Sequence, residues 1–384
     1  MKFKTFMPLA LMHRSFIAIF SASFLLSLAA CSGAPKPKAT PLTAISTQTA
    51  AKPVWNTRLG AVNFPLQVRV LDNTLLAASS AGTVAALDAA SGKELWRAEV
   101  GEPIAAGVGS DGKVTAVVTR ANELVALADG RQLWRYKLGA QVYSAPFVAG
   151  ERVFVLAADR SVSAFDGQTG AKLWQHTRSS SEPLVLSQAG VMLAVGDTLV
   201  VGFSGRLAGL DPSTGKARWE VAVAAPRGID DVERLADLVG PASRLGASVC
   251  VRAFQASVAC VNAKQGSLAW TKPARGIHGL AGDEQWVLGT ETDSKVFAWR
   301  RSDGEVAWNT DSLRYRDVSA PLLLGGSVVV GDFEGWVHFL SSKDGALLGR
   351  VATDGSAIMV APVFAGNTLV VVTVAGGIYG FALQ

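Results

Sequence analysis

Apolar strands and polar turn residues form a short pattern that recurs along most of the chain. Its clearest copy is Gly82–Trp96, GTVAALDAASGKELW. Val84–Leu87 predict a short strand, which Asp88 ends because its carboxylate can accept backbone N–H groups in a tight turn. Gly92 can adopt the left-handed conformation that closes the turn. Each copy therefore predicts a β-hairpin that ends on a large aromatic anchor.

The pattern repeats to the end of the chain, in whole and in incomplete copies. Whole copies are Arg160–Trp174 and Gly205–Trp219, shorter ones end at Trp134, Trp270 and Trp308, and Gly335–Gly349 and Gly377–Leu383 keep only the strand half. A second β-rich pair precedes each hairpin, as in Ser144–Asp159 and Ser319–Asp332. The two pairs together predict four strands per repeat.

Tryptophans mark the repeats and give their period. They are Trp55, Trp96, Trp134, Trp174, Trp219, Trp270 and Trp308, between 38 and 51 residues apart. A period of about 40 residues with four strands is typical of a β-propeller, whose blades stack face to face. Burial on both faces also explains uniformly apolar strands such as Val328–Val330, where alternation would otherwise be expected.

The two ends of the chain predict how the ring closes. A lone strand, Val54–Asn56, precedes the first repeat, and three strands between Met359 and Leu383 follow the last one. The eighth tryptophan slot, 41 residues after Trp308, holds Gly349. We predict an all-β fold, an eight-bladed β-propeller with four antiparallel strands per blade, in which the N-terminal strand completes the last blade. A seven-bladed ring with a fragment at each end is the alternative, but it leaves exposed strand edges, which natural sheets avoid.

Length and composition agree with a large repeat domain. The chain has 384 residues, 49% of them hydrophobic, which suffices for a large core but is too long for one ordinary sandwich. After residue 31 no stretch shows a long helical period or an apolar span of about 20 residues. We therefore predict a soluble mature chain without a transmembrane helix.

Residues 1–30 have the composition of a signal peptide. A basic start leads into the apolar run Phe16–Leu28, and the sequence Leu-Ala-Ala-Cys ends at Cys31. This ending resembles a bacterial lipobox, which implies cleavage before Cys31 and acyl chains that anchor it to a membrane. An ordinary signal peptide with an incidental cysteine is the alternative. In the lipoprotein pattern Ser32 favours the outer membrane, so we expect a lipid anchor on its periplasmic face.

A tether and a nearly balanced charge follow the signal. We assign residues 31–52 to the lipidated cysteine and a flexible tether, because Ser32–Lys52 is rich in Ala, Pro, Thr, Ser and Lys, and residues 53–384 to the propeller. Without the three basic side chains of residues 1–30, 33 basic side chains face 31 acidic ones. This balance, without a basic stripe, argues against a nucleic-acid partner.

The sequence shows no pattern for catalysis or metal binding. Gly107–Gly112 matches the GxGxxG motif, but strand residues follow where a dinucleotide site needs a helix, so we predict a hairpin turn. His176, His278 and His338 lack metal-ligand or catalytic spacing. The aspartate before each turn is predicted to cap it. We therefore predict no catalytic residue, no metal and no cofactor.

Cys250 and Cys260 lie on two arms of a predicted hairpin. A two-residue turn, Gln255-Ala256, would place Cys250 opposite Val261 and put the two thiols on opposite faces. A one-residue bulge would align them, in a compartment that permits disulfides. We favour two buried thiols.

Two long steps between tryptophans predict functional loops. The first contains Ser179–Gly190, and the second contains Ala225–Gly240, the densest mixed-charge cluster of the chain. A solvated insertion with no partner is the alternative for the second loop.

These features together resemble a known family. The repeats resemble the quinoprotein-type propeller repeat, and the stretches EPLVLSQAG, DDVERLADL and DFEGWVHFLSSKDG, with the lipobox and tether, resemble the BamB family of the outer-membrane β-barrel assembly (BAM) machinery over residues 31–384. The resemblance implies a non-enzymatic periplasmic scaffold that binds the POTRA domains of the BamA barrel protein, lies among other assembly lipoproteins and assists folding and insertion of outer-membrane proteins.

The family's contact residues carry over in part. Leu184 and Leu186 match its two alternate leucines, which point the same way on an extended strand, but ordinary blade packing is the alternative for either one. Polar residues replace the arginine that follows the leucines in the family. Asp237 matches the first aspartate of the family's pair, and Val239 stands in place of the second. Arg234 is our candidate for a compensating cation.

Two other functions fit the same fold. A dehydrogenase that uses a quinone cofactor (PQQ) should carry calcium-binding carboxylates and amides and a catalytic aspartate in the channel, and none can be placed in this sequence. A propeller could also take extended strands of unfolded outer-membrane proteins at a blade edge.

Overall fold

The computed structural model describes residues 37–45, 48–49, 51–178, 185–224 and 235–383. The chain divides into two compact units, Met1–Lys38 and Ala39–Gln384. Pro37 and Lys38, the described residues of the first unit, have no regular secondary structure. The described part of the second unit consists of strands, turns and loops. None of its segments is a helix that could cross a membrane.

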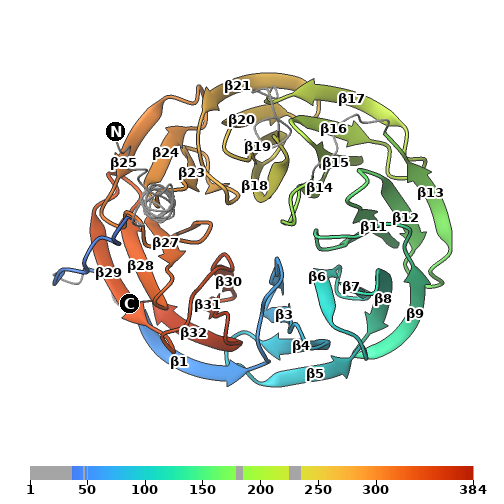
Figure 1. The fold of residues 1–384 in the computed structure, drawn as a ribbon, viewed down its shortest axis with the longest axis horizontal. Helices are drawn as coiled ribbons and strands as arrows, with labels where there is room; N and C mark the ends of the chain where they lie inside the picture. The colour runs from blue at the N-terminus through green and yellow to red at the C-terminus, as the bar shows by residue number, and fades with distance from the viewer. Residues whose placement is uncertain (1–36, 46–47, 50, 179–184, 225–234, 384) are drawn as a thin grey trace, which may run out of the picture. The chain divides into compact units, whose positions relative to one another are not determined.

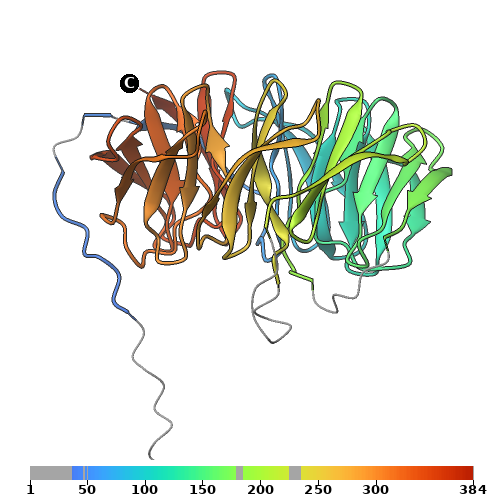
Figure 2. The same cartoon turned by 90° about the horizontal axis from the view of Figure 1, so that it is seen from above.

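Eight four-stranded antiparallel sheets form the second unit and are arranged as the blades of a ring (Figures 1 and 2). Blades 1 to 4 consist of β2 (Arg69–Leu71), β3 (Thr74–Ala78), β4 (Thr83–Asp88) and β5 (Glu94–Glu99); β6 (Ile104–Ser110), β7 (Thr115–Thr119), β8 (Glu123–Ala128) and β9 (Arg131–Lys137); β10 (Phe147–Ala149), β11 (Arg152–Leu156), β12 (Val162–Asp166) and β13 (Lys172–His176); and β14 (Met192–Val195), β15 (Thr198–Phe203), β16 (Arg206–Leu210) and β17 (Ala217–Ala222).

Blades 5 to 8 consist of β18 (Leu238–Leu245), β19 (Ser248–Ala253), β20 (Ser257–Asn262) and β21 (Ser267–Pro273); β22 (Ala281–Gly282), β23 (Trp286–Thr290), β24 (Val296–Arg300) and β25 (Val306–Thr310); β26 (Leu322–Leu324), β27 (Ser327–Gly331), β28 (Trp336–Ser341) and β29 (Leu347–Ala352); and β30 (Val363–Ala365), β31 (Thr368–Val372), β32 (Gly377–Leu383) and β1 (Ala51–Arg58). The first strand of each blade lies towards the centre of the ring and the fourth lies at the rim (Figure 1).

The predicted closure of the ring is confirmed. Strand β1 pairs antiparallel with β32, from Ala51 opposite Leu383 to Arg58 opposite Gly377. The strand begins two residues before the predicted boundary at residue 53, because Ala51 and Lys52 already pair with the end of the chain. The eight-bladed prediction is therefore right, and the seven-bladed alternative is wrong.

The core lies between the blades, as the uniformly apolar strands predict. Val328–Val330 of β27 have 0% exposure, and Leu369–Val371 of β31 are likewise buried. These inner strands pack on neighbouring blades with both faces, so period-two alternation disappears in them.

The turn between the third and fourth strands has the predicted cap. Asp88 Oδ1 accepts the Ser91 N–H at 2.8 Å, and Gly92 has a φ of 69°. Asp166 and Asp211 cap the corresponding turns of blades 3 and 4 through the N–H groups of Thr169 and Thr214. The aspartates therefore serve as turn caps, as their position before each turn predicts.

Each of the recurring tryptophans packs on the next blade rather than on its own turn. The Trp55 ring lies against Gly92 of blade 1, and its Nε1–H donates to Ala89 O at 2.9 Å. The same packing joins Trp96 to Gly130, Trp134 to Gly170, Trp174 to Gly215, Trp219 to Gly266, Trp270 to Gly304 and Trp308 to Gly345. A Cβ on any of these glycines would enter the indole ring or crowd it, so the turn glycine also seats the tryptophan of the preceding blade. We call each such contact a tryptophan lock.

The junction between blades 7 and 8 has no tryptophan lock. Gly349 of β29 occupies the tryptophan slot. Blade 8 also lacks the turn that would receive an indole, because its third strand is β32 and its fourth is β1, from the other end of the chain. The missing tryptophan therefore follows from the way the ring closes.

The predicted state of the cysteines is wrong. Ala253 pairs with Ser257, so the hairpin turn contains three residues, Phe254–Ala256, instead of two. This extra residue makes Cys250 and Cys260 direct cross-strand partners, and they form a disulfide.

The structure limits the predicted turn at the Gly107–Gly112 motif to the last residues of the motif and Lys113. Residues 107–110 belong to β6, and the turn to β7 follows at Asp111–Lys113. Asp111 Oδ1 accepts the N–H groups of Lys113 and Val114, and Gly112 has a φ of 94°. The motif therefore belongs to a hairpin, as predicted.

Candidate functional site

The described parts of the two long loops meet on one face of the ring. Residues 185–191 lead into β14, and residues 235–237 lead into β18. Both lie on the face where the fourth strand of one blade ends and the first strand of the next begins, which we call the site face. Two of the four predicted contact residues, Leu186 and Asp237, are described; Leu184 and Arg234, like Cys31, lie outside the described residues.

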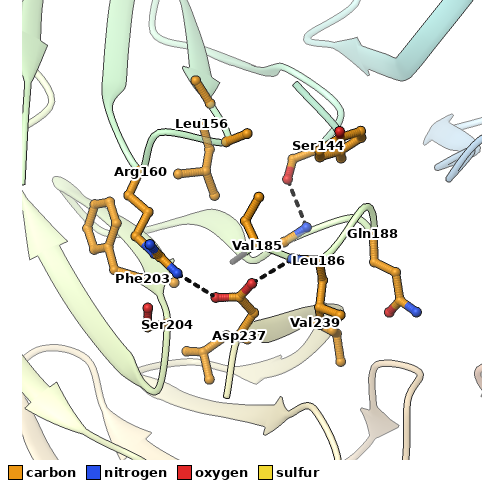
Figure 3. Close-up of a pocket in the computed structure, with 16 residues that line it drawn as sticks. Ser144, Leu156, Arg160, Val185, Leu186, Gln188, Phe203, Ser204, Asp237 and Val239 are labelled. Atoms are coloured by element: carbon orange, nitrogen blue, oxygen red, sulfur yellow. Dashed lines mark hydrogen bonds and ion pairs between the residues drawn. The ribbon is translucent and has the colours of Figure 1, made fainter. Parts of the chain in front are cut away.

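Asp237 joins the two loops. Its Oδ2 accepts the Leu186 N–H at 2.8 Å (Figure 3). Its side chain is largely enclosed, because the residue is only 9% exposed. The family resemblance implies Asp237 as a partner contact, and the geometry shows that Asp237 fixes the backbone of the first loop.

Arg160 supplies the positive charge next to Asp237. Its Nη2 lies 3.7 Å from Asp237 Oδ1, and the residue is 7% exposed (Figure 3). Arg160 lies in the turn between β11 and β12 with a φ of 62°. The equivalent turn of blade 1 has Gly82 with a φ of 116°. An arginine in place of this glycine was the feature of the sequence that could have pointed to Arg160 as a site residue. Sequence reasoning missed it and looked for the cation at Arg234.

Further hydrogen bonds hold the first loop between its neighbours. The Gly190 N–H donates to Ser144 Oγ at 2.8 Å, and the Gly240 N–H donates to Ala189 O at 2.8 Å. Gly190 also forms an isolated bridge with Val239. Blades 3 and 5 thus fix a loop that belongs to blade 4.

The loop and its supports enclose a small pocket. It has a volume of about 50 Å³, with Leu156, Val185, Phe203 and Val239 among its apolar lining residues. Arg160, Asp237, Ser144 and Gln188 contribute polar atoms to the same lining (Figure 3). Val185 is 37% exposed and Leu186 is partly buried, so the loop offers an apolar edge rimmed by polar groups.

The pocket is suited to binding a protein side chain. Interaction hot spots are typically well-packed, desolvated pockets surrounded by groups that exclude water. Among the described residues, no group of three or more His, Cys, Asp or Glu side chains could hold a metal ion. The ring also has a central channel with a cavity of about 690 Å³, lined largely by apolar residues such as Phe64, Met192 and Leu322.

Comparison with known proteins agrees with this architecture. Residues 80–310 match the family described as "Outer membrane protein assembly factor BamB". The chain is 38% identical to the outer membrane protein assembly factor BamB of Burkholderia pseudomallei over 97% of this chain and 99% of that protein.

Two solved structures show how far the likeness extends. BamB from Moraxella catarrhalis superposes with a TM-score of 0.79 at 25% identity, covering 87% of this chain and 100% of that one. A quinohemoprotein alcohol dehydrogenase from Comamonas testosteroni superposes with a TM-score of 0.65 at 13% identity, covering 87% of this chain and 76% of that one, which shows a shared fold alone. The chain belongs to the BamB family of outer membrane protein assembly factors.

Proposed function

We propose that this chain acts in outer-membrane protein assembly as a non-enzymatic scaffold that binds a BamA-type barrel protein through its periplasmic POTRA domains. Membership of the BamB family supports a role in outer-membrane protein assembly. The meeting of the two loops at Asp237 supports this part of the site face as the surface that contacts the POTRA domains. A lipid anchor at Cys31 would hold the scaffold on the periplasmic face of the outer membrane. Other lipoproteins of the machinery are further partners in this proposal, and binding of unfolded clients at a blade edge is a separate property to be tested by crosslinking.

The single observation that carries the contact surface is the path from Leu186 through Asp237 to Arg160. The Leu186 N–H and the Arg160 guanidinium both approach the Asp237 carboxylate, so the ion pair fixes the loop that carries the apolar edge. Fixing the loop before binding lowers the entropy cost of association. Asp237 and Arg160 therefore act as positioning residues, while Val185, Leu186 and Leu184 make the apolar contact.

Binding to the purified POTRA domains of the partner tests this proposal. Leu186→Ala should weaken binding about tenfold or more, since truncation of a hot-spot residue typically costs about 2 kcal/mol or more. Leu268→Ala is the control, because Leu268 is similarly apolar and 40% exposed but lies on the rim strand of blade 5. Equal binding of both variants and the unmodified chain would overturn the contact surface.

A pair of variants separates positioning from direct contact. Asp237→Asn keeps an oxygen acceptor for the Leu186 N–H but removes the charge opposite Arg160. Asp237→Ala removes both interactions and should weaken binding more. If the two variants lost affinity equally, the negative charge of Asp237 would itself contact the partner, and its role in positioning the loop would be ruled out. Arg234 remains our candidate for a cation that faces the partner, and unchanged binding by Arg234→Glu would remove it.

The dehydrogenase alternative has its own test. The chain would be incubated with quinone cofactor and calcium while cofactor absorbance and dye reduction are recorded. The scaffold proposal expects neither a shifted absorbance nor turnover. Turnover of an alcohol would replace the scaffold proposal with the enzyme.

A further inference from the structure

The segment before β1 is hydrogen-bonded to the side of the propeller. The Thr40 N–H donates to Arg314 O at 2.9 Å, and Arg316 Nη1 donates to Thr40 O at 3.1 Å. Arg350 Nη2 donates to Thr43 O at 2.5 Å. We call the described residues 39–45 and 48–49 the strap; in Figures 1 and 2 the first of these ranges is the blue segment beside the orange-red blades.

The strap follows the rim strand of blade 7. Its later residues, Gln48 and Thr49, donate their N–H groups to Leu348 O at 2.7 and 3.2 Å. Leu348 and Arg350 flank Gly349, the slot that lacks a tryptophan. The strap therefore bonds to the rim strand of blade 7, beside the junction without a tryptophan lock.

A buried charge network supports one end of the strap. Arg316 is 3% exposed, and its Nε donates to Asp332 Oδ2 at 2.7 Å while its Nη2 pairs with Glu334. His338 Nε2 lies 2.9 Å from the same Asp332 oxygen. Because Asp332 and Glu334 both hold the guanidinium, the Thr40 carbonyl meets a donor that is already fixed in place.

The two ends of the strap lie on opposite faces of the ring. Thr40 contacts the connection between β25 and β26, and such connections lie on the site face. Strand β1 starts at Ala51, opposite Leu383 at the end of β32, and a third strand ends on the face away from the site. The chain therefore enters at the site face and crosses the rim before it joins blade 8.

We propose that the strap makes the site face the side of the propeller that is held close to the membrane. The proposal rests on the lipid anchor at Cys31, which is part of the proposed function. Thr40 lies nine positions after Cys31, and nine residues of fully extended chain span at most about 32 Å. If the strap were free, the first fixed residue would be Ala51, on the opposite face, at the end of a tether of up to about 70 Å. The strap thus turns a long tether into a short one and sets which face looks towards the lipid.

Hydrogen exchange of the full mature chain tests whether the strap is docked in solution. Peptides that cover residues 39–49 should be protected, and Arg350→Gln should reduce this protection. Arg97→Gln is the matched control, because Arg97 follows Trp96 on β5 as Arg350 follows Gly349 on β29. Exchange at the rate of an unstructured peptide in the unmodified chain would overturn the proposal.

Energy transfer to labelled lipid tests the orientation. A donor would be attached to the lipidated chain in vesicles at Glu102→Cys on the site face or at Ala90→Cys on the opposite face of the same blade; both residues are exposed. Transfer should be higher from residue 102. Replacing residues 39–49 with a Gly-Ser sequence of equal length should abolish or reverse this difference.

The two proposals fail in different ways. A chain that does not associate with vesicles lacks the anchor, which overturns the proposed function. A chain that binds vesicles but shows equal transfer from residues 90 and 102, or the same difference after strap replacement, overturns the orientation by the strap and leaves the anchor intact.

Discussion

The seven junctions with a tryptophan lock differ from the junction of blades 7 and 8 in the interactions found at them. At seven junctions an indole lies on a glycine turn of the next blade, as Trp134 does on Gly170. At the junction of blades 7 and 8 there is no indole, and the strap bonds to Leu348 and Arg350 through its backbone. A tryptophan lock requires a continuous turn to receive it. Where the closing blade is built from both chain ends, that turn is missing, and the strap bonds instead to the rim strand of blade 7.

The largest expected effect is the loss of one tryptophan lock. Trp134 is 8% exposed, and its Nε1–H donates to Gly167 O at 2.9 Å. Trp134→Ala should lower the free energy of unfolding by about 3–5 kcal/mol, as for other buried aromatic truncations. Trp134→Phe keeps most of the ring and loses the hydrogen bond, so it should cost less. Urea unfolding followed by circular dichroism measures both, and equal losses would mean that the hydrogen bond, rather than packing, makes the lock.

The next effect is a weakening of the strap by acid. Burial lowers the pKa of His338, which faces Asp332, Arg316 and Arg350, so the folded state holds the ring neutral. The unfolded chain binds a proton below about pH 6.5, so this contribution is complete above that pH and is lost as the pH falls, by at most about 1.4 kcal/mol per pH unit. Urea midpoints, and protection of the strap against hydrogen exchange, should differ less between pH 7.5 and 5.0 for His338→Gln than for the unmodified chain.

A second buried histidine provides the control for this pH effect. Burial also lowers the pKa of His278, which lies between blades 5 and 6 near Arg252 and Asp317. His278→Gln should likewise reduce the pH dependence of global stability, but exchange within the strap should keep its acid dependence. If His278→Gln changed strap exchange as His338→Gln does, the network below the strap would not be its specific support.

A smaller effect is expected from the strap's own backbone. Thr40→Pro removes the N–H that donates to Arg314 O and should lower global stability by about 1 kcal/mol or less, the usual worth of one exposed hydrogen bond. Exchange at residues 48–49 should nevertheless accelerate. A loss of stability as large as that of Trp134→Ala would show that the strap is a lock of equal strength.

The smallest effect on stability is expected at the site. Val185 is 37% exposed and is one of the apolar residues of the first loop. Val185→Ala should change the free energy of unfolding by less than about 0.5 kcal/mol, as is usual for surface positions. Its affinity for POTRA domains should still fall. A large loss of stability would mean that the loop belongs to the ring's core rather than to a binding surface.

Sequence periodicity predicted the ring because a tryptophan lock is a local signal that recurs. An indole and a turn glycine appear in most repeats, and Gly349 marks the exception in advance. The second role of these glycines, as seats for the indole of the preceding blade, could not be predicted, since it joins residues of neighbouring repeats. The cysteine pairing was missed for a smaller reason: one extra turn residue reverses which side chains face each other.

The candidate site was only partly predictable. Leu186 and Asp237 were found through the resemblance, but their mutual hydrogen bond spans two blades and has no sequence pattern. Arg160 comes from a third blade and occupies a turn position that Gly82 fills in blade 1. The strap was expected to be a tether because its composition is that of a linker, and composition does not show that neighbouring arginines can bind its carbonyls.

Because β1 pairs with β32, the ring can close only after β32 has been synthesised. Strand β1 is synthesised long before β32 and stays unpaired until β32 appears, and their pairing closes a loop of more than three hundred residues. Loss of β32 through truncation would leave β1 with an open hydrogen-bonding edge, a feature that proteases and aggregation exploit. The unpaired edge of β1 in blade 8 is therefore enough to mark a chain without β32 for degradation, whatever the state of the other blades.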